Sequence, residues 1–525
     1  MSRPHLPRWV TLAALAGAVL LQSGCILTGP SEYIHNGFKV GPNYCKPPAP
    51  VAEEWIQARN ADVQKRHLQD WWTVFQDAKL NSLIDTAYEQ NLNLRVLGTR
   101  VLQARAQQRI AAGNLFSQRQ QLQGMYLTGT GNGHRTWFNF TGFNLSWEID
   151  FWGRIRRGIE SANASLDASV ENYDDALVTL LADAATNYVQ YRIAQQRIKI
   201  ARDNLRTQER LLAVAEQQFK VGTGTALDVE QLRTLVEQTR ATIPALQIAL
   251  GQANDTLCTL LGIPPRNLEP ELGTGPELGD SPMPSTPNWV AAGIPADLLR
   301  RRPDVRSAER QVAAQSAQIG VAEADLYPTL AVNSILGYDT INLLGLPSSG
   351  GFLGLFYPSF TWKILNYGRI LNNVRSQTAR LQELIATYQN RVLTAAREVQ
   401  TPLRGFLRSR EQAEDLARSV AAAVAATKIQ ENNFRVLKAD VNRLFTLENS
   451  KLQQQDNLAV AQGNIALNLI NVYRALGGGW ELRCQKDHGH EALPIASAVQ
   501  EKTPDSAAQE ELPKPKALPR DKEEK

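Results

Sequence analysis

Hydrophobic and polar positions alternate along two short segments of the chain, one ending near residue 150 and the other near residue 364. A period of two predicts β-strands with one apolar and one polar face. In the first segment the apolar set is Phe143, Leu145, Trp147 and Ile149, and the polar set is Asn144, Ser146, Glu148 and Asp150. The pattern fits a membrane barrel with lipid outside and water inside, and it also fits a half-buried strand of a soluble sandwich.

Each alternating segment is expected to be the second strand of a hairpin. The later one alternates Phe360, Trp362 and Ile364 with Ser359, Thr361 and Lys363. Glycine-containing residues 129–133 and 347–351 precede the two segments and are typical of hairpin loops. The sequence therefore predicts four strands, arranged as two pairs.

A very long helix is predicted directly after the first strand pair. Residues 154–218 contain no Pro and a single glycine, Gly158. They would span about 100 Å at about 1.5 Å per residue. Apolar residues recur every seven positions, at Leu177, Ala184, Tyr191, Ile198, Leu205, Leu212 and Phe219. This heptad stripe favours a coiled-coil-like bundle.

The chain contains an internal duplication with an offset of 215 residues. The matched pairs include Trp147 and Trp362, Gly153 and Gly368, Tyr173 and Tyr388, and Phe219 and Phe434. Upstream, residues 114–116 match residues 325–327 at an offset of 211, so one copy has a four-residue insertion between its strands. A constant offset over more than a hundred residues predicts a repeated structural unit.

Both copies follow one plan. A helical stretch, residues 80–116 or 296–326, is followed by two strands, a very long helix, a tight tip and a returning helix. The second long helix repeats the seven-residue step from Val392 to Phe434 but contains Pro402 and Gly405, which should kink it. The first copy has Asn187 in place of that proline, so we expect the two helices to curve differently.

The N-terminus has the pattern of an export signal. A basic start is followed by residues 9–21 without a charge, a stretch too short to cross a bilayer as a helix. The order Leu21-Gln22-Ser23-Gly24-Cys25 resembles a bacterial lipobox, although Gln22 occupies a position where an aliphatic residue is usual. We expect residues 1–24 to be a signal peptide and Cys25 to be lipidated; cleavage nearby with loss of Cys25 is the alternative.

Composition narrows the functional classes. The 525 residues include 56 Lys+Arg and 52 Asp+Glu, and a formal net charge of +4 argues against a nucleic-acid-binding surface. Four Cys exclude a disulfide-dense scaffold. The six His lie outside the long middle of the chain, and no nucleophile–base arrangement or phosphate loop is present. We therefore expect no enzyme and no cofactor or resident metal.

Several motifs resemble the outer membrane factor family, the TolC/NodT/OprM-type efflux channels. They are Val40-Gly41-Pro42-Asn43-Tyr44 with Trp55, Ile294-Pro295-Ala296-Asp297-Leu298-Leu299, and Arg301-Arg302-Pro303-Asp304. The resemblance covers roughly residues 40–480. It implies a homotrimer in which each chain gives four strands to a shared 12-stranded outer-membrane barrel. The helices then form a long periplasmic tunnel, closed where a periplasmic adaptor and an inner-membrane pump, of RND type, dock.

The resemblance also implies roles for the two helical tips. Val221, Gly222 and Thr223 match the family's first tip, which meets the adaptor, and Val436, Leu437 and Lys438 form the second, where Leu437 replaces the usual glycine. For the first tip, Gly222 and Gly224 would supply positive φ, and Thr225 or Asp228 would cap the next helix. Helix capping alone is the alternative reading of these residues.

Beyond the second tip, family members carry aspartates that ring the closed tunnel end. Here those positions hold Arg443 and Thr446, with Asp440 and Glu448 nearby. We take Asp440, Arg443 and Thr446 as the predicted tunnel aperture. Lys438 and Arg443 would make this mouth less attractive to cations than is usual; two residues on a solvated helix face are the equal alternative.

The expected fold class is mainly α with transmembrane β, built by internal duplication. The predicted segments are a signal peptide (1–24), a lipidated extended segment (25–66), repeat 1 (67–290), repeat 2 (291–480) and a disordered polar tail (481–525). The predicted function is a passive exit duct of a tripartite efflux or secretion system, lipid-anchored in the outer membrane. The alternative is a periplasmic coiled-coil adaptor or scaffold lipoprotein.

Overall fold

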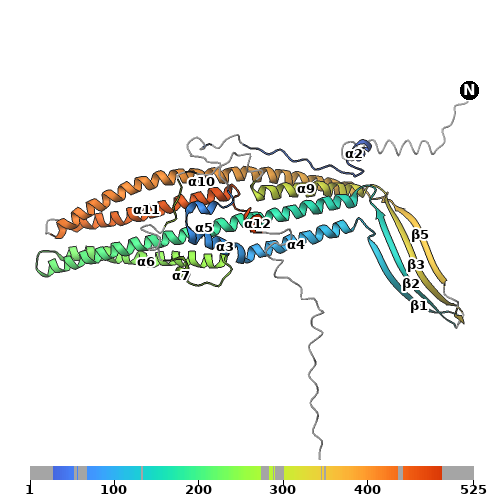
Figure 1. Cartoon of the computed structure of the whole chain (residues 1–525), viewed down its shortest axis with the longest axis horizontal. Coiled ribbons are helices and arrows are strands. Elements are labelled where there is room, and N and C mark those ends of the chain that lie inside the picture. The colour runs from blue at the N-terminus through green and yellow to red at the C-terminus, as the bar shows by residue number, and fades with distance from the viewer. Residues whose placement is uncertain are drawn as a thin grey trace, which may run out of the picture.

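The computed structural model describes residues 28–51, 56, 68–131, 134–273, 283–287, 289, 301–343, 346–347, 351–435 and 441–486. The molecule is long and narrow, with a sheet at one end and paired helices along the rest of its length (Figure 1). Cys25 and the tip residues 436–440 lie outside the described residues.

The sheet is antiparallel throughout. Its strands are β1 (Arg119–Gly131), β2 (His134–Ile149), β3 (Thr329–Leu343), β4 (Leu346–Pro347) and β5 (Gly351–Thr361). Strand β1 pairs with β2, β2 with β3, and β3 with both β5 and the two-residue β4. The outer edges of the sheet are therefore β1 and β5 (Figure 1). Pairing between β1 and β2 continues to Gly131 and His134, which leaves a shorter loop than the one that contains β4.

The helices repeat in the same order around each strand pair. In the first copy they are α3 (Ala78–Gln90), α4 (Leu92–Gly113), α5 (Arg154–Lys220) and α6 (Ala226–Leu260); in the second they are α9 (Pro303–Ala324), α10 (Arg369–Arg435) and α11 (Val441–Ala475). Helices α5 and α10 have 67 residues each, in agreement with the prediction of a very long helix after each strand pair.

The predicted first helical stretch of copy one is broken in the structure. Asn91 ends α3 with an extended backbone and begins α4, where its side chain accepts a hydrogen bond from the Leu94 amide. Its amide group also donates to the Leu260 carbonyl at the end of α6. Asn91 therefore joins three helix ends, a role that its local sequence does not reveal.

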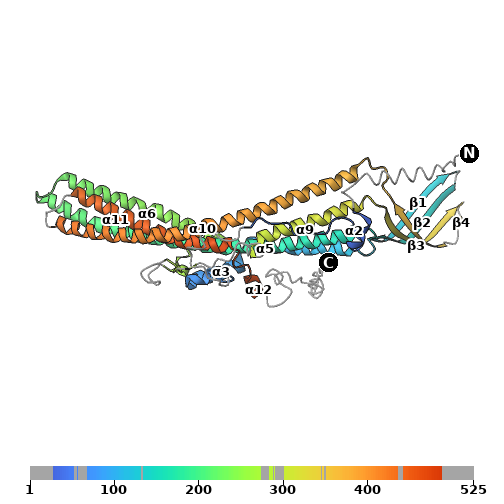
Figure 2. The same ribbon diagram turned by 90° about the horizontal axis from the view of Figure 1, so that it is seen from above.

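The helices form a layer with two open sides. Helix α5 packs against α4 and α9 towards the sheet and against α6 and α11 further away, and α10 packs against α9 and α11. Helix α10 continues through Pro402, and its first half runs at an angle to α9 while its second half follows α11 (Figure 2). At Gly405 an added Cβ would lie 2.4 Å from the Asn468 side chain, so this glycine permits close contact with α11.

The main hydrophobic core lies on one side of this layer. It lies where the end of α6 meets the start of α4 and the end of α11 meets the start of α9. A short 3-10 helix, η1 (Trp71–Phe75), inserts Trp71, which stacks on Tyr473 of α11 at 5.4 Å between ring centroids. Helices α3 and α7 (Glu269–Leu272) add further buried residues to this Trp71 cluster. We expected a disordered tail from residue 481, but Leu482–Lys486 form α12, with Leu482 buried and Arg483 paired to Asp174 at 2.8 Å.

The heptad stripe of α5 is buried over only part of its predicted length. Leu177, Ala184, Tyr191 and Ile198 are buried, but Phe219 is 50% exposed in the single chain. Nearer the tip, Leu211 and Ala215 are buried instead. A straight α-helix turns by about 20° relative to a seven-residue repeat over each heptad, so a strict stripe rotates away from its neighbour.

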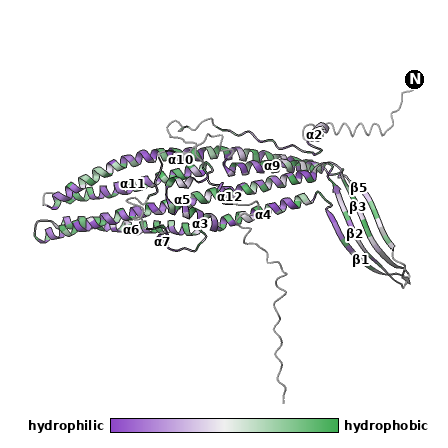
Figure 3. Ribbon diagram, viewed as in Figure 1, coloured by the Kyte–Doolittle hydropathy of each residue, from purple (hydrophilic) through white to green (hydrophobic). Residues whose placement is uncertain are grey.

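The segment predicted to be extended after Cys25 begins with a short helix, α2 (Pro30–His35). Residues 36–51 then run along the outside of the helical layer (Figure 1). Apolar and polar residues are interspersed along every long helix (Figure 3). Among the described residues, no helix combines the length and hydropathy needed to cross a membrane.

Candidate functional site

The sheet has the two-faced pattern predicted from its sequence. Phe143, Trp147 and Ile149 pair with Leu336, Val332 and Leu330 on the adjacent strand, which places these apolar residues on one face. On the opposite face the Ser146 hydroxyl donates to Asn333 Oδ1 at 2.8 Å, and Asn333 Nδ2 donates to Ser359 Oγ at 2.8 Å. The polar face is therefore cross-linked by side-chain hydrogen bonds from β2 to β5.

The first helical tip is a tight turn closed by backbone hydrogen bonds. Gly222 has φ of +79°, whereas Gly224 is outside the positive-φ region, so only the first glycine has the predicted backbone. The Thr223 and Gly224 amides both donate to the Gln218 carbonyl, at 2.9 and 3.1 Å. This turn leaves Val221 62% exposed at the end of the molecule.

Thr225 and Asp228 cap helix α6 together. The Asp228 amide donates to Thr225 Oγ1 at 3.2 Å, and the Thr225 amide donates to Asp228 Oδ2 at 2.9 Å. This reciprocal capping box satisfies two amides at the start of the helix. The expectation that one or the other residue caps the helix is thus met by both.

The second tip is only partly described. Val436, Leu437, Lys438 and Asp440 lie outside the described residues. Arg443 and Thr446, at the start of α11, are both exposed in the single chain. Thr446 Oγ1 donates to the Asn442 carbonyl one turn earlier at 2.9 Å.

An apolar cluster joins the two hairpins just behind their tips. It contains Leu211, Ala215, Val229, Leu232, Leu235, Phe434, Val441 and Leu444. Because residues from both copies contribute, the two hairpins are held side by side at this end (Figure 1). The exposed first tip therefore lies next to packed residues from both hairpins.

A charged group is buried beyond this apolar cluster on α11. Glu448 is fully buried, with an oxygen 2.8 Å from the Lys451 ammonium, and Glu431 of α10 lies 3.9 Å from the same ammonium. Burial, and then the neighbouring Glu431 carboxyl, raise the pKa of Glu448 to about 7 against the opposing effect of Lys451. Both Glu448 and Lys451 occupy the buried stripe that contains Val441 and Leu444, and opposite charges on such a stripe are the sequence signal that marks this pair.

The raised pKa predicts that the hairpins are less stable at higher pH. Below pH 4.5 Glu448 is protonated in both the folded and unfolded chain, so it costs nothing. The cost grows as pH rises from 4.5 to 7 and is complete above 7, at about 3 kcal/mol at most. Glu448→Gln should remove this loss, measured as urea stability at pH 5 and pH 8. Asp415→Asn, on an exposed part of α10, is the control; an equal pH response in Glu448→Gln and the wild type would contradict the prediction.

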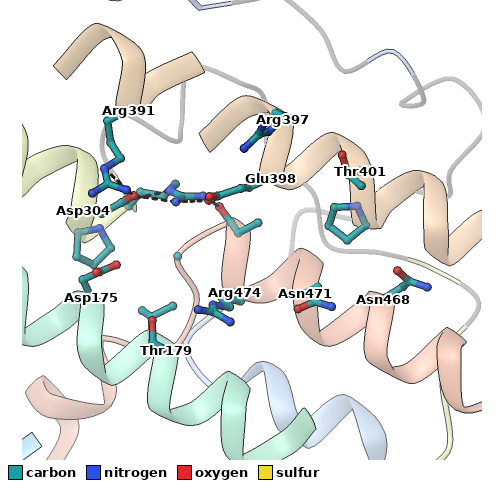
Figure 4. Close-up of a pocket in the computed structure, with 16 residues that line it drawn as sticks. Asp175, Thr179, Asp304, Arg391, Arg397, Glu398, Thr401, Asn468, Asn471 and Arg474 are labelled. Atoms are coloured by element: carbon teal, nitrogen blue, oxygen red, sulfur yellow. Dashed lines mark hydrogen bonds and ion pairs between the residues drawn. The ribbon is translucent and has the colours of Figure 1, made fainter. Parts of the chain in front are cut away.

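A polar cavity of about 610 Å³ lies where α9 begins and α11 ends, against α5 and α10 (Figure 4). Arg302 is buried in its wall, and its guanidinium bonds Asp304 through two nitrogens at 2.8 and 2.9 Å. It also bonds Glu398 at 2.6 Å and the Ala475 carbonyl at 2.9 Å. Burial, and then the charge of Asp304, raise the pKa of nearby Asp175. The sequence analysis identified Arg302 and Asp304 as part of a motif. In the structure Arg302 connects the start of α9 and the end of α11 to Glu398 of α10.

The N-terminal segment is bound closely to the helices. Arg157 is 2% exposed and donates to the Val40 and Gly41 carbonyls at 3.0 and 2.7 Å. Gly41 has φ of +82°, and a Cβ on it would lie 2.3 Å from the Cα of Gly320. Two glycines in contact therefore let the extended segment reach the backbone of α9.

Within the described residues, no group of three or more His, Cys, Asp or Glu is arranged to hold a metal ion. Cys258 is fully buried, whereas Cys45 and Cys484 are exposed.

Comparison with known proteins shows which family has this repeated architecture. The family model described as outer membrane efflux protein matches residues 83–263 and 294–478. Nodulation protein T of Rhizobium leguminosarum bv. viciae is 30% identical over 472 residues, covering 89% of this chain and 93% of that protein. The probable outer membrane lipoprotein SilC of Salmonella typhimurium is 28% identical, covering 84% and 95%. The solved outer-membrane channel OprN is 29% identical with a TM-score of 0.76, covering 84% and 99%.

Proposed function

The chain belongs to the outer membrane efflux protein family, and from that premise we propose that three copies of it close into one continuous duct. The protein is the outer-membrane channel of a tripartite efflux system. Members of the family are transport channels, and we propose that this chain likewise has no catalytic activity and no cofactor. The energy for transport then comes from an inner-membrane pump, of RND type, through a periplasmic adaptor.

The sheet carries this proposal. Its four long strands leave backbone groups unpaired at the β1 and β5 edges, and an open edge between lipid and water is unfavourable. Three such sheets joined edge to edge give 12 strands with no open edge. The apolar face would then meet outer-membrane lipid, and the hydrogen-bonded polar face would line a water-filled lumen.

The helices continue the proposed duct into the periplasm. Two 67-residue helices per chain extend about 100 Å from the sheet, far beyond the length of an ordinary globular helix. The helical layer has two open sides, with α4 and α6 on one and α10 on the other. Each open side would meet a neighbouring subunit. A periplasmic adaptor or scaffold is the second candidate, but two strand pairs in one four-strand sheet with open edges favour the channel.

We propose that Cys25 carries the lipid anchor. The SilC relative is described as a probable outer membrane lipoprotein, and the bound segment that follows Cys25 would tie the anchor to the helices. Labelling with a fatty-acid analogue should mark the wild type and leave Cys25→Ser unmarked. Equal labelling of both proteins would exclude this site.

We propose that the first tip docks the adaptor. Val221 and Leu227 are 62% and 65% exposed there, beside a support shared by both hairpins. Val221→Asp should place an unpaired charge in the contact and lower efflux in cells at least tenfold, while channel assembly remains normal. Ile34→Asp, equally exposed at 62% on α2 at the sheet end of the molecule, is the matched control. Equal efflux by the two variants would contradict a docking role for this tip, and the second tip, Val436 to Lys438, would then be tested in the same way.

We propose that Asp440, Arg443 and Thr446 line the aperture, with Arg443 opposing cation entry. Reversing the charge by Arg443→Asp should shift the reversal potential of single channels towards cation selectivity at low salt. Arg408→Asp, an exposed residue on α10, provides the control. No change in ion preference for Arg443→Asp would place Arg443 on a solvated face outside the aperture.

The channel itself is tested with the purified full-length protein. We expect oligomers that resist heating in detergent and ion currents in planar bilayers. Outer-membrane fractions of the producing cell should contain the same oligomers. A soluble monomer without current would overturn the proposal and favour the adaptor reading.

A further inference from the structure

The polar face of the sheet becomes apolar towards its hairpin end, away from the helices (Figure 1). We propose that the apolar part, which consists of Met125, Leu127, Phe138 and Phe140, is a contact surface for apolar and aromatic small molecules that pass through the duct. We call these four residues the apolar collar. The inference rests on the proposed channel and deepens it, because it names a class of cargo that the barrel contacts.

The register of the strands places the collar on the polar face. Ser146 bonds Asn333 on this face, and β2 pairs with β3 in one continuous register that extends past this pair to Trp137. Successive side chains of a strand point to opposite faces. Phe140 and Phe138 lie an even number of residues from Ser146, so they point to the same face as Ser146.

Two glycines show directly where the Phe140 ring lies. A Cβ added to Gly142 would lie 2.4 Å from an atom of this ring, and a Cβ added to Gly337 would lie 2.6 Å from another. The two glycines pair with each other across β2 and β3, and both are buried. The Phe140 ring therefore covers two adjacent backbone positions of the polar face while it stays partly exposed itself.

Strand β1 adds the two members of the collar that are not aromatic. Met125 pairs with Phe140 and Leu127 pairs with Phe138, so the four side chains form one patch. Met125 is 38% exposed and Leu127 is 55% exposed in the single chain. The flexible Met125 side chain lets the patch adapt to apolar molecules of different shapes.

The apolar section continues across the sheet. Ile335 of β3 pairs with Leu355 of β5, and by alternation they share the face on which Asn333 bonds Ser359. Leu355 is 47% exposed. Each chain therefore contributes apolar side chains from all four long strands, and three chains would surround the lumen with them.

The opposite face changes in the reverse sense at the same level. Phe143 belongs to the apolar band nearer the helices, whereas Asn139 and Thr141, which alternate with the collar, are polar and exposed. Lipid does not suit the face of the collar, because the same face carries Ser146 and the charged Glu148. The molecules that the collar meets are therefore those inside the duct.

Apolar and aromatic molecules gain most from such a surface. A molecule that leaves the polar section of the duct can transfer part of its apolar surface from water to the collar. The Phe138 and Phe140 rings add attraction for aromatic groups and for organic cations. The collar is open to water, so the contact is weak and cargo exchanges rapidly. A surface of this kind favours the passage of apolar cargo without holding it.

The contact is tested with the purified full-length channel in planar bilayers. Two probe cations of the same charge are compared, tetramethylammonium and benzyltrimethylammonium, which differ by one aromatic ring. Each is added to both sides in constant potassium chloride, and the concentration that halves the potassium current is measured. For the wild type we expect benzyltrimethylammonium to act at a concentration at least fivefold lower, because only its ring can contact the collar.

Two double variants remove the collar in different ways. Phe138→Ser with Phe140→Ser should reduce the preference for the benzyl probe to twofold or less, and Met125→Ser with Leu127→Ser should at least halve it. The second variant leaves Phe140 on its glycines, so it keeps the test valid where the first fails to insert. Gln121→Ser, a shortened polar side chain on the same face nearer the helices, is the matched control and should behave as the wild type.

Equal action of the two probes on the wild type, or an unchanged preference in both double variants, would overturn the collar as a contact surface. A larger potassium current with an unchanged preference would also overturn it and assign these residues to narrowing of the mouth. The channel would survive either result, because its current does not depend on the collar. Absence of current from the wild type would instead overturn the proposed channel.

Discussion

Replacing Arg302 with alanine should destabilise the folded chain by about 3–5 kcal/mol, because it leaves a buried carboxylate without its partner. Asp304 is itself buried and bonds Arg302 through both of its oxygens. The same substitution frees the Ala475 carbonyl at the end of α11. The loss is measured as the free energy of unfolding in urea, on protein purified in detergent.

Arg391→Ala is the matched control for this prediction. Its guanidinium lies 3.8 Å from the same Asp304 carboxylate, but its side chain is 52% exposed. Exposed ion pairs contribute less than about 1 kcal/mol, so this variant should remain close to the wild type. Equal losses for both arginines would show that burial of the Arg302 network contributes little. The double variant Arg302→Met with Asp304→Leu should recover part of the loss, because the buried Asp304 carboxylate is removed together with its partner.

Gly320→Ala is expected to detach the N-terminal segment from the helices and cost about 2–4 kcal/mol. The added Cβ would lie 2.6 Å from the Val40 carbonyl oxygen and 2.9 Å from the Arg157 side chain. Either the segment or Arg157 must move, and Arg157 then loses the two carbonyls it bonds in the interior. Hydrogen bonds to a charged group contribute about 1.5–3 kcal/mol each. Unfolding in urea and the rate of trypsin cleavage after Lys39 measure the effect.

Gly158→Ala is the control, since no heavy atom lies within 4 Å of the Cβ it would add. A glycine inside a helix is less favourable than alanine by about 0.5–1 kcal/mol, so this change should stabilise α5 slightly. The two glycine substitutions are therefore expected to have opposite signs. A stable Gly320→Ala variant with a protected N-terminal segment would contradict the close-contact argument.

Prediction from sequence was most effective where a pattern was periodic. The alternation around Trp147 gave the strand and its faces, and the offset of Trp147 from Trp362 gave the repeated plan. Prediction from sequence was weaker where one residue connects two elements. Asn91 ends one helix and begins another, and its contact with the end of α6 depends on a residue 169 positions away.

The candidate site was predicted unevenly for a similar reason. Gly222 at the first tip was identified because a local turn requires positive φ, whereas Gly224 was assigned the same backbone without needing it. Glu448 was seen only as a neighbour of the aperture. Its burial and raised pKa result from the approach of α10, which brings Glu431 to the same ammonium as Glu448.

The sequence alone determined the repeated unit, the approximate length of α5 and the faces of the strands, because a period and a constant offset can be read directly along the chain. The tertiary structure decided which distant residues meet: Arg302 with Glu398, Arg157 with Val40, and Asn333 with Ser146. Contacts of this kind depend on packing between elements far apart in sequence, and local patterns contain no record of that packing.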